Sequence, residues 1–169
     1  KVKAKLDLSA GRLAQALVDQ AMRNDRLRPK DDISCAVLYF RSPRRLLVMT
    51  GPPFSKERDG ELVELALSYP GRKAICGGTT ASIISRGLGR EVTVDLGDLD
   101  PDVPPPSRME GVDLITEGTL TMAHVAELLE RSGQDVELPP NAVGDLIELM
   151  LESDIIEFVV GTRINEAHQ

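Results

Sequence analysis

Apolar residues recur along the chain with two different spacings, which predict where helices and strands form. A spacing of three to four residues places apolar side chains on one face of a helix, whereas short apolar runs bounded by turn residues indicate buried strands. We expect strands at residues 33–40, 45–50, 72–76, 91–96, 112–116 and 154–161. We expect helices from Ser9 to about Asn24, from Ser55 to before Pro70, within 77–89, at 121–131 and at 142–153, with Ser9, Ser55 and Asn141 as N-caps.

The order of these segments from Arg45 onward predicts the fold class. Short buried strands that alternate with amphipathic helices are typical of an α/β protein, with a mostly parallel sheet and helices on both faces. The alternation at 91–96 indicates a half-exposed edge strand, and the Pro- and Asp-rich stretch 99–107 cannot continue a sheet or a helix. Pro43 marks a boundary between an N-terminal segment, 1–41, and an α/β domain, 45–169.

Length and composition agree with one domain that has its own core, or with one domain plus a fragment of another. The chain has 169 residues, of which 41% are hydrophobic and 28% are charged, as expected of a soluble globular protein. No apolar run approaches the roughly 20 residues that span a bilayer, and no secretory signal is present, so we expect a cytoplasmic protein without membrane contact. The chain begins Lys-Val-Lys rather than with Met, so we expect a start inside a longer gene product, with a start after processing as the alternative.

Charge is distributed unevenly. Residues 1–90 hold 17 Lys and Arg against 9 Asp and Glu, whereas residues 91–169 hold 3 against 18. Such a division can steer an acidic partner to one end, or it can reflect two differently charged faces of one domain. Nucleic-acid binding is disfavoured, because the basic residues are scattered and only three Phe and two Tyr are available to stack on bases.

The two cysteines give no sign of metal binding. Cys35 and Cys76 stand in or at the end of apolar runs and have no metal-ligand spacing between them. We expect both to be buried structural thiols in a reducing cytoplasm.

Two acids, Asp31 and Asp32, stand directly before the apolar run at 33–40. Paired carboxylates directly before a strand often bind a hard metal ion, and they are also common at the end of a turn. The helical segment LAQALVDQAM, a short basic loop and then PKDDISCAVLYF resemble, in this order, the C-terminal edge of metal-dependent protein phosphatases of the stage II sporulation protein E type. The resemblance covers residues 1–41.

That resemblance implies an organisation and an activity. Residues 1–41 would be the last helix and a core strand of an incomplete phosphatase β-sandwich, with Asp31 as one ligand of a dinuclear Mn or Mg centre. Residues 45–169 would be an appended regulatory domain in a bacterial signalling protein. The parent would dephosphorylate a phosphoserine or phosphothreonine partner through metal-activated water, a reaction that needs several carboxylates. The other acids are missing here, so we expect this fragment to be inactive and to hold no cofactor.

The stretch CGGTTASIISRGLG places Gly77, Gly78, Thr79 and Thr80 between a strand and a helix. This arrangement presents free backbone N–H groups to an anion, the glycines allow close approach, and the threonines add hydroxyl donors. The stretch matches neither a Walker loop nor a dinucleotide fingerprint. A tight turn in which Thr79 or Thr80 caps the helix explains the same residues without a ligand.

Four Gly- and Thr-rich segments are expected at the carboxyl ends of the strands, where open parallel sheets bind ligands. Among their residues, Arg163 can pair with a phosphate or carboxylate, and Glu117 can accept from a ribose or bind a cation. The alternative is that Gly and Thr are simply favourable in such turns. The segments are 50–53 with Gly51, 77–80, 116–119 with Gly118, and 161–165.

Two functions therefore remain open from the sequence. The first is the ligand-sensing portion of a metal-dependent serine/threonine phosphatase, which binds a small polar or phosphorylated molecule. The second is a stand-alone α/β module that binds a small anion and is unrelated to phosphatases, with Asp31 and Asp32 only a turn. A stand-alone enzyme at the strand ends is weaker, because no general base or nucleophile is evident. A homodimer is compatible with either function.

Overall fold

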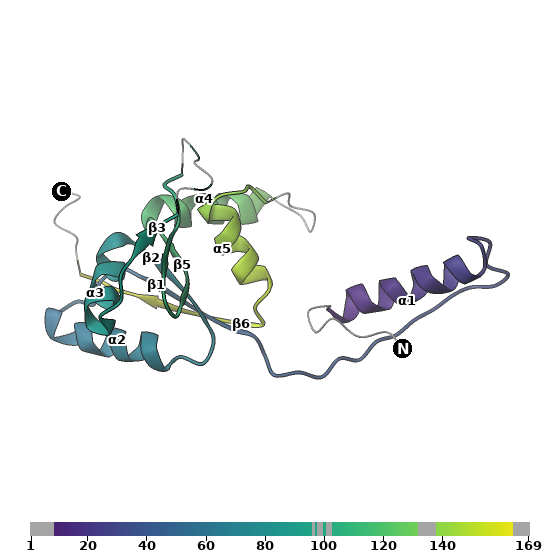
Figure 1. The fold of residues 1–169 in the computed structure, drawn as a ribbon, viewed down its shortest axis with the longest axis horizontal. Helices are drawn as coiled ribbons and strands as arrows, with labels where there is room; N and C mark the ends of the chain where they lie inside the picture. Colours follow the sequence, from purple (N-terminus) through teal and green to yellow (C-terminus); the bar gives the residue numbers. More distant parts are fainter. Residues whose placement is uncertain (1–8, 96, 98–99, 101–102, 132–137, 164–169) are drawn as a thin grey trace. The chain divides into compact units, whose positions relative to one another are not determined.

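The computed structural model describes residues 9–95, 97, 100, 103–131 and 138–163, and the chain divides into two units, Lys1–Ser42 and Pro43–Gln169 (Figure 1). The α-helices of the described residues are α1 (Ala10–Asn24), α2 (Asp59–Ser68), α3 (Gly78–Leu88), α4 (Thr119–Arg131) and α5 (Ala142–Leu151), with a 3₁₀ turn η1 (Lys56–Arg58). The strands are β1 (Arg45–Thr50), β2 (Arg72–Cys76), β3 (Thr93–Val94), β4 (Ser107–Met109), β5 (Val112–Thr116) and β6 (Ile155–Val160).

The first unit contains α1, which begins as its sequence predicts. The hydroxyl of Ser9 accepts the backbone N–H of Arg12 at 3.2 Å, a standard N-cap. The helix ends at a left-handed turn in which Arg26 and Leu27 have φ of 53° and 60°. None of the residues of α1 is buried. Within the described part of the chain, no helix has both the length and the apolar character that crossing a bilayer requires.

The predicted buried strand at 33–40 is wrong. This segment has no regular secondary structure, and the side chains of Leu38 and Phe40 are 81% and 89% exposed. Cys35 is exposed as well, so its prediction as a buried thiol is also wrong. The physical reason is that β-propensity describes a side chain on a pleated, half-buried surface. No described residue pairs with this segment to form such a surface.

The second unit is an α/β sheet domain, which confirms the predicted fold class. The described strands form one six-stranded sheet in the order β3-β4-β5-β2-β1-β6. The four strands at its centre and one edge, β5, β2, β1 and β6, run parallel, whereas β3 and β4 are antiparallel additions. This mixed arrangement is common in α/β domains.

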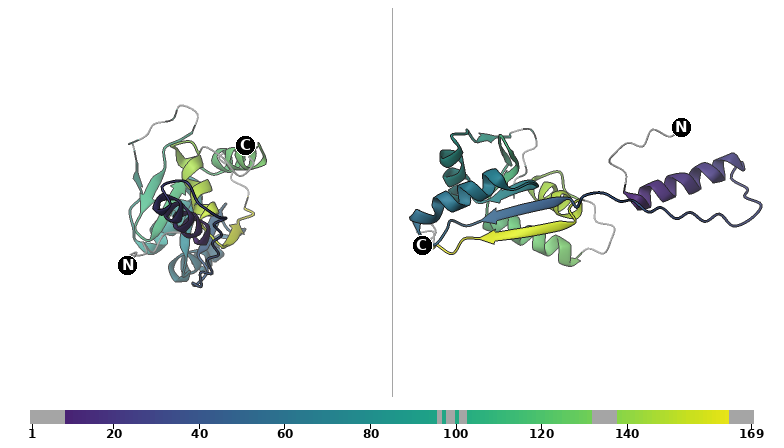
Figure 2. Two further views of the ribbon diagram at one scale, coloured as in Figure 1. Left: turned by 90° about the vertical axis from the view of Figure 1, so that its right-hand side faces the viewer. Right: turned by 90° about the horizontal axis from the view of Figure 1, so that it is seen from below.

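Alternate residues of the central strands point to opposite faces of the sheet and form two cores. One face packs against α2 and α3, with Leu47 and Met49 of β1 at its centre. The other face packs against α4 and α5, with Leu46 and Val48 of β1 in that core. Figure 2 shows the two helix layers on either side of the strands.

Most element boundaries in this unit follow the sequence, with three corrections. The predicted cap at Asn141 is confirmed, since its side-chain oxygen accepts N–H groups of Val143 and Gly144 at 2.9 and 3.2 Å. Ser55 makes no side-chain cap hydrogen bond; η1 follows it, and α2 begins only at Asp59. The strand expected at 91–96 is reduced to β3, with Leu96 outside the described residues, and β4 was not predicted at all.

Candidate functional site

The chain leaves two neighbouring strands in opposite directions. From β2 it enters α3 on one face of the sheet, and from β5 it enters α4 on the other face. When the helices that follow two adjacent parallel strands cover opposite faces of the sheet, a crevice is left outside the carboxyl ends of these strands. Open α/β sheets bind ligands in this crevice. The pair β2 and β5 is therefore the topological switch point of this sheet.

A cleft of about 740 Å³ opens at this switch point. We call it the switch-point cleft. Its volume falls in the range of small-molecule sites. The turn after β2, the turn after β5, the end of β1 and the segment after β6 all contribute to it. Its lining includes Gly51, the segment 77–80, the segment 117–119 and Arg163.

The turn after β2 is shaped by Gly77. Its φ of +127° and ψ of 130° are accessible to glycine and strained for other residues. Its N–H donates to the carbonyl of Thr116 at 2.9 Å, which ties the β2 and β5 turns together. A Cβ on Gly118 would lie 3.3 Å from the Cα of Gly77, so the two backbones approach closely at the base of the cleft.

The ends of β1 and β6 also meet in close backbone contact. The N–H of Gly161 donates to the carbonyl of Thr50 at 2.7 Å, and that of Arg163 donates to the carbonyl of Pro52 at 3.4 Å. A Cβ on Gly161 would lie 2.1 Å from the Pro52 carbonyl oxygen, so only glycine fits there. This contact brings the Arg163 side chain to the cleft.

The two charged side chains that line the cleft, Glu117 and Arg163, each contact another group of the protein. An oxygen of Glu117 accepts the N–H of Leu120 at 3.3 Å and so caps the start of α4. Arg163 Nη2 lies 3.5 Å from Asp59 Oδ1 at the start of α2. Arg163 Nη1 is buried and has no hydrogen-bond partner among the described residues. The guanidinium is thus anchored on one side and has donor capacity to spare.

The lining of the cleft includes one thiol and one carboxylate, those of Cys76 and Glu117. Burial raises the pKa of the Cys76 thiol, and the nearby Glu117 carboxylate acts in the same direction, so this thiol stays protonated at neutral pH. No histidine or lysine lies among the described residues that line the cleft.

The acid pair at Asp31 and Asp32 does not form a metal site by itself. An oxygen of Asp31 accepts the N–H of Asp32 at 2.9 Å, and both residues are exposed. No group of three or more His, Cys, Asp or Glu side chains in the described part of the chain is placed to hold a metal ion. A dinuclear Mn or Mg centre needs several carboxylates, and Asp31 alone does not fit one.

The predicted ligand-binding residues all line one cleft. Gly51, Gly77, Gly78, Thr79, Thr80, Glu117, Gly118 and Arg163 all contribute to it, whereas Ile164 and Asn165 lie outside the described residues. Sequence reasoning missed the contribution of Val92, Pro105 and Ser107, because 91–96 reads as an edge strand and the Pro-rich stretch 99–107 reads only as an interruption of the sheet. It also missed Asp59 as the partner of Arg163, for which the sequence carries no signal.

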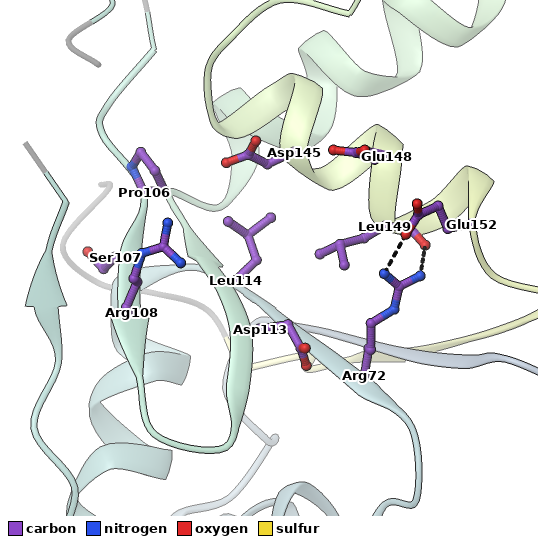
Figure 3. A pocket seen from close by; sticks show the side chains of 10 residues that line it. All are labelled: Arg72, Pro106, Ser107, Arg108, Asp113, Leu114, Asp145, Glu148, Leu149 and Glu152. Carbon is purple, nitrogen blue, oxygen red and sulfur yellow. Dashed lines mark hydrogen bonds and ion pairs between the residues drawn. The ribbon is translucent and has the colours of Figure 1, made fainter. Parts of the chain in front are cut away.

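A second cavity, of about 240 Å³, lies between α5 and the β4–β5 hairpin. Figure 3 shows Asp145 and Glu148 above it, with Arg72 and Arg108 on the facing strands. Arg72 is engaged with Glu152 at 2.8 Å, and Arg108 is paired with Asp95 at 2.9 Å. This cavity therefore presents cations that the protein already neutralises.

The fold and the cleft together define an open α/β protein with a polar crevice at its switch point. No protein-family model matches the chain, and neither a curated protein nor a solved structure does so.

Proposed function

We propose that the unit Pro43–Gln169 is a sensing domain that binds a small polar or phosphorylated molecule in the switch-point cleft. The observation that carries this proposal is the convergence of polar turns from four parallel strands on one cleft at the switch point of the sheet. The hydroxyls and backbone N–H groups of the β2 turn provide donors, and Glu117 provides an acceptor.

Gly78 offers a direct test. It lies at the first position of α3, lines the cleft, and a Cβ built on it meets no atom within 4 Å. The variant Gly78→Val therefore adds a side chain to the cleft at a position where its Cβ meets no other atom. We expect the free energy of unfolding of the free protein to change by less than about 1 kcal/mol. We expect the rise in melting temperature induced by a panel of nucleotides, sugar phosphates and carboxylates to disappear.

Gly60 supplies the matched control. It lies in the first turn of α2, its Cβ would also meet nothing within 4 Å, and it does not line the cleft. Gly60→Val should keep the ligand-induced shift. A panel that produces no shift in the native protein, or a shift that survives in Gly78→Val, would refute the proposed site.

We propose further that this sensing domain regulates a metal-dependent serine/threonine phosphatase of the stage II sporulation protein E type. The observation that favours this context is the exposure of Leu38 and Phe40 in an apolar segment directly after Asp31. Such a segment gains backbone partners and burial when the rest of a β-sandwich is present. In that context the parent supplies the remaining carboxylates, and Asp31 binds Mn or Mg beside them.

Activity of the parent protein tests this second proposal. Asp31→Ala should abolish Mn-dependent hydrolysis of a phosphoserine peptide, whereas Asp25→Ala, a change at the C-cap of α1 outside the acid pair, should retain it. Full activity in Asp31→Ala would contradict the proposal. The alternative, a binding module unrelated to phosphatases, predicts that the gene encodes no further Asp-Gly acid motifs upstream.

A further inference from the structure

Thr80 presents a buried hydroxyl that the protein does not satisfy. Its side chain is 1% exposed, it lines the switch-point cleft, and its Oγ1 has no hydrogen-bond partner among the described residues. A buried hydroxyl without a partner is unfavourable, so such groups are expected to meet a ligand or another polar atom. Thr80 lies in the first turn of α3, where the free N–H groups of the helix are also found.

The start of α3 is left uncapped by the protein. Gly77 occupies the N-cap and has no side chain, no side-chain cap bond is formed, and the first turn contains no acid. The backbone N–H groups of the first turn therefore carry the positive end of the helix dipole toward the cleft. With the Thr80 hydroxyl, they supply several donors at the start of α3, which suits an anion with several oxygens.

Arg163 adds a full positive charge to the same cleft. Its side chain is 23% exposed, its Nη2 lies 3.5 Å from Asp59 Oδ1, and its Nη1 is buried without a hydrogen-bond partner in the described part of the chain. A guanidinium fixed in this way can donate to the oxygens of a phosphate.

Glu117 adds a carboxylate to the lining of the cleft. Its carboxylate caps α4, and a carboxylate can accept further donors such as ligand hydroxyls. A second anion is disfavoured beside it. A volume of about 740 Å³ also accommodates far more than a phosphate ion.

We infer that the ligand of the switch-point cleft is a phosphate monoester of a polyhydroxylated molecule, an inference that rests on the sensing function proposed above. Its phosphate lies at the start of α3, with the Thr80 hydroxyl and Arg163 as donors. Its hydroxyl groups face Glu117. Sugar phosphates and nucleotides share this chemistry.

Calorimetric titration of the full chain with three probes tests the class of ligand. We expect ribose 5-phosphate to bind most tightly, inorganic phosphate to bind more weakly, and ribose to bind about 100-fold more weakly than ribose 5-phosphate or not at all. A fourth titration with AMP distinguishes a nucleotide from a sugar phosphate, and tighter binding of either one agrees with the inference.

Two threonines provide a matched pair of variants for the phosphate contact. Thr121 is also fully buried with an unpartnered Oγ1, and it does not line the cleft. Replacing either residue by Val removes an unsatisfied hydroxyl, so both variants should raise the melting temperature of the free protein. Only Thr80→Val should weaken binding of ribose 5-phosphate, by about tenfold, and Thr80→Ser should retain it.

The outcomes separate this inference from the proposed function. Equal affinity for ribose and ribose 5-phosphate, lost in Gly78→Val, would overturn the phosphate anchor and leave the cleft as a binding site. Unchanged affinity in Thr80→Val would also overturn the inference. If none of the four probes binds, the phosphate-ester assignment is wrong. The melting shifts of Gly78→Val with unphosphorylated compounds then decide whether the proposed function stands.

Discussion

Three side chains near the β1–β6 edge of the sheet, Arg45, Tyr69 and Glu157, form a polar cluster. Glu157 accepts hydrogen bonds from the Arg45 guanidinium and, at 3.0 Å, from the Tyr69 hydroxyl. The guanidinium also lies 5.7 Å from the centre of the Tyr69 ring. The hydrogen bond from Arg45, followed by that from Tyr69, lowers the pKa of Glu157 below its ordinary value of 4.5.

This lowered pKa predicts a pH-dependent contribution to stability. Because the folded state holds the ionised carboxylate more strongly than the unfolded state, the contribution is complete above the unfolded pKa of 4.5 and is lost as the pH falls through the lowered folded pKa. Glu157→Gln should lower the melting temperature at pH 7, and the difference from the native protein should shrink below about pH 4.5. Thermal unfolding of both proteins between pH 3 and 7 measures this.

Other carboxylates titrate in both proteins, so their effects on the melting temperature largely cancel when the native protein is compared with Glu157→Gln. Asp95 and Glu61 also have a lowered pKa, caused mainly by hydrogen bonds from Arg108 and Arg58. Their acid sensitivity appears in the native protein and in Glu157→Gln alike. A difference in melting temperature that stays constant from pH 3 to 7 would show that Glu157 acts through packing rather than through its charge.

Glycines at the strand ends illustrate how far residue-level reasoning reaches. The sequence identifies Gly51, Gly77, Gly78 and Gly161 equally as turn residues. The structure distinguishes them, because Gly161 is confined by the Pro52 carbonyl whereas Gly78 borders open space. Which glycine serves packing and which leaves room for a ligand depends on contacts between segments far apart in the sequence.

Helices and strands with a clear apolar period were predictable. β1, β2 and β5 match their apolar runs at 45–50, 72–76 and 112–116 residue for residue. The predictions from these runs are correct because each strand is buried between two helix layers and so must be apolar on both faces. The cap at Asn141 was predictable because its mechanism is local.

Elements whose existence depends on a partner were not predictable. The segment 33–40 has a strand-like composition, and the described residues provide no neighbouring strand for it. β4 is only three residues long and follows three consecutive prolines, so its formation depends on pairing with β5 rather than on its own pattern. Apolar period alone cannot decide either case.

At the level of the whole molecule, each of the four turns expected at the carboxyl ends of the strands contributes residues to one cleft, although Pro53, Gly161 and Thr162 line a neighbouring cavity. The position of the switch point was not evident from the sequence. Its position depends on α3 and α4 covering opposite faces of the sheet. Both helices are amphipathic with similar patterns, and such patterns do not state which face a helix covers. The sequence therefore predicted turns at the carboxyl ends of the strands and not which pair of strands forms the switch point.

Ligand contact in the switch-point cleft would involve both helix layers of the domain. The β2 turn leads into α3 and the β5 turn into α4, and the hydrogen bond from Gly77 to Thr116 already joins them. A molecule that bridges the two turns adds contacts to both helix starts at once. Such a link is a physical route by which binding can change the stability of the whole α/β domain.

The most direct measurement is a titration of the isotopically labelled chain with ribose 5-phosphate, followed through its backbone amide NMR signals. We expect the largest shifts at Gly78, Thr79 and Thr80, and further shifts at 117–119, because these amides and turns face the cleft. Gly78→Val should remove these shifts. Shifts centred instead on the second cavity, near Arg72 and Glu152, or no shifts at saturating ribose 5-phosphate, would contradict binding of this ligand in the cleft.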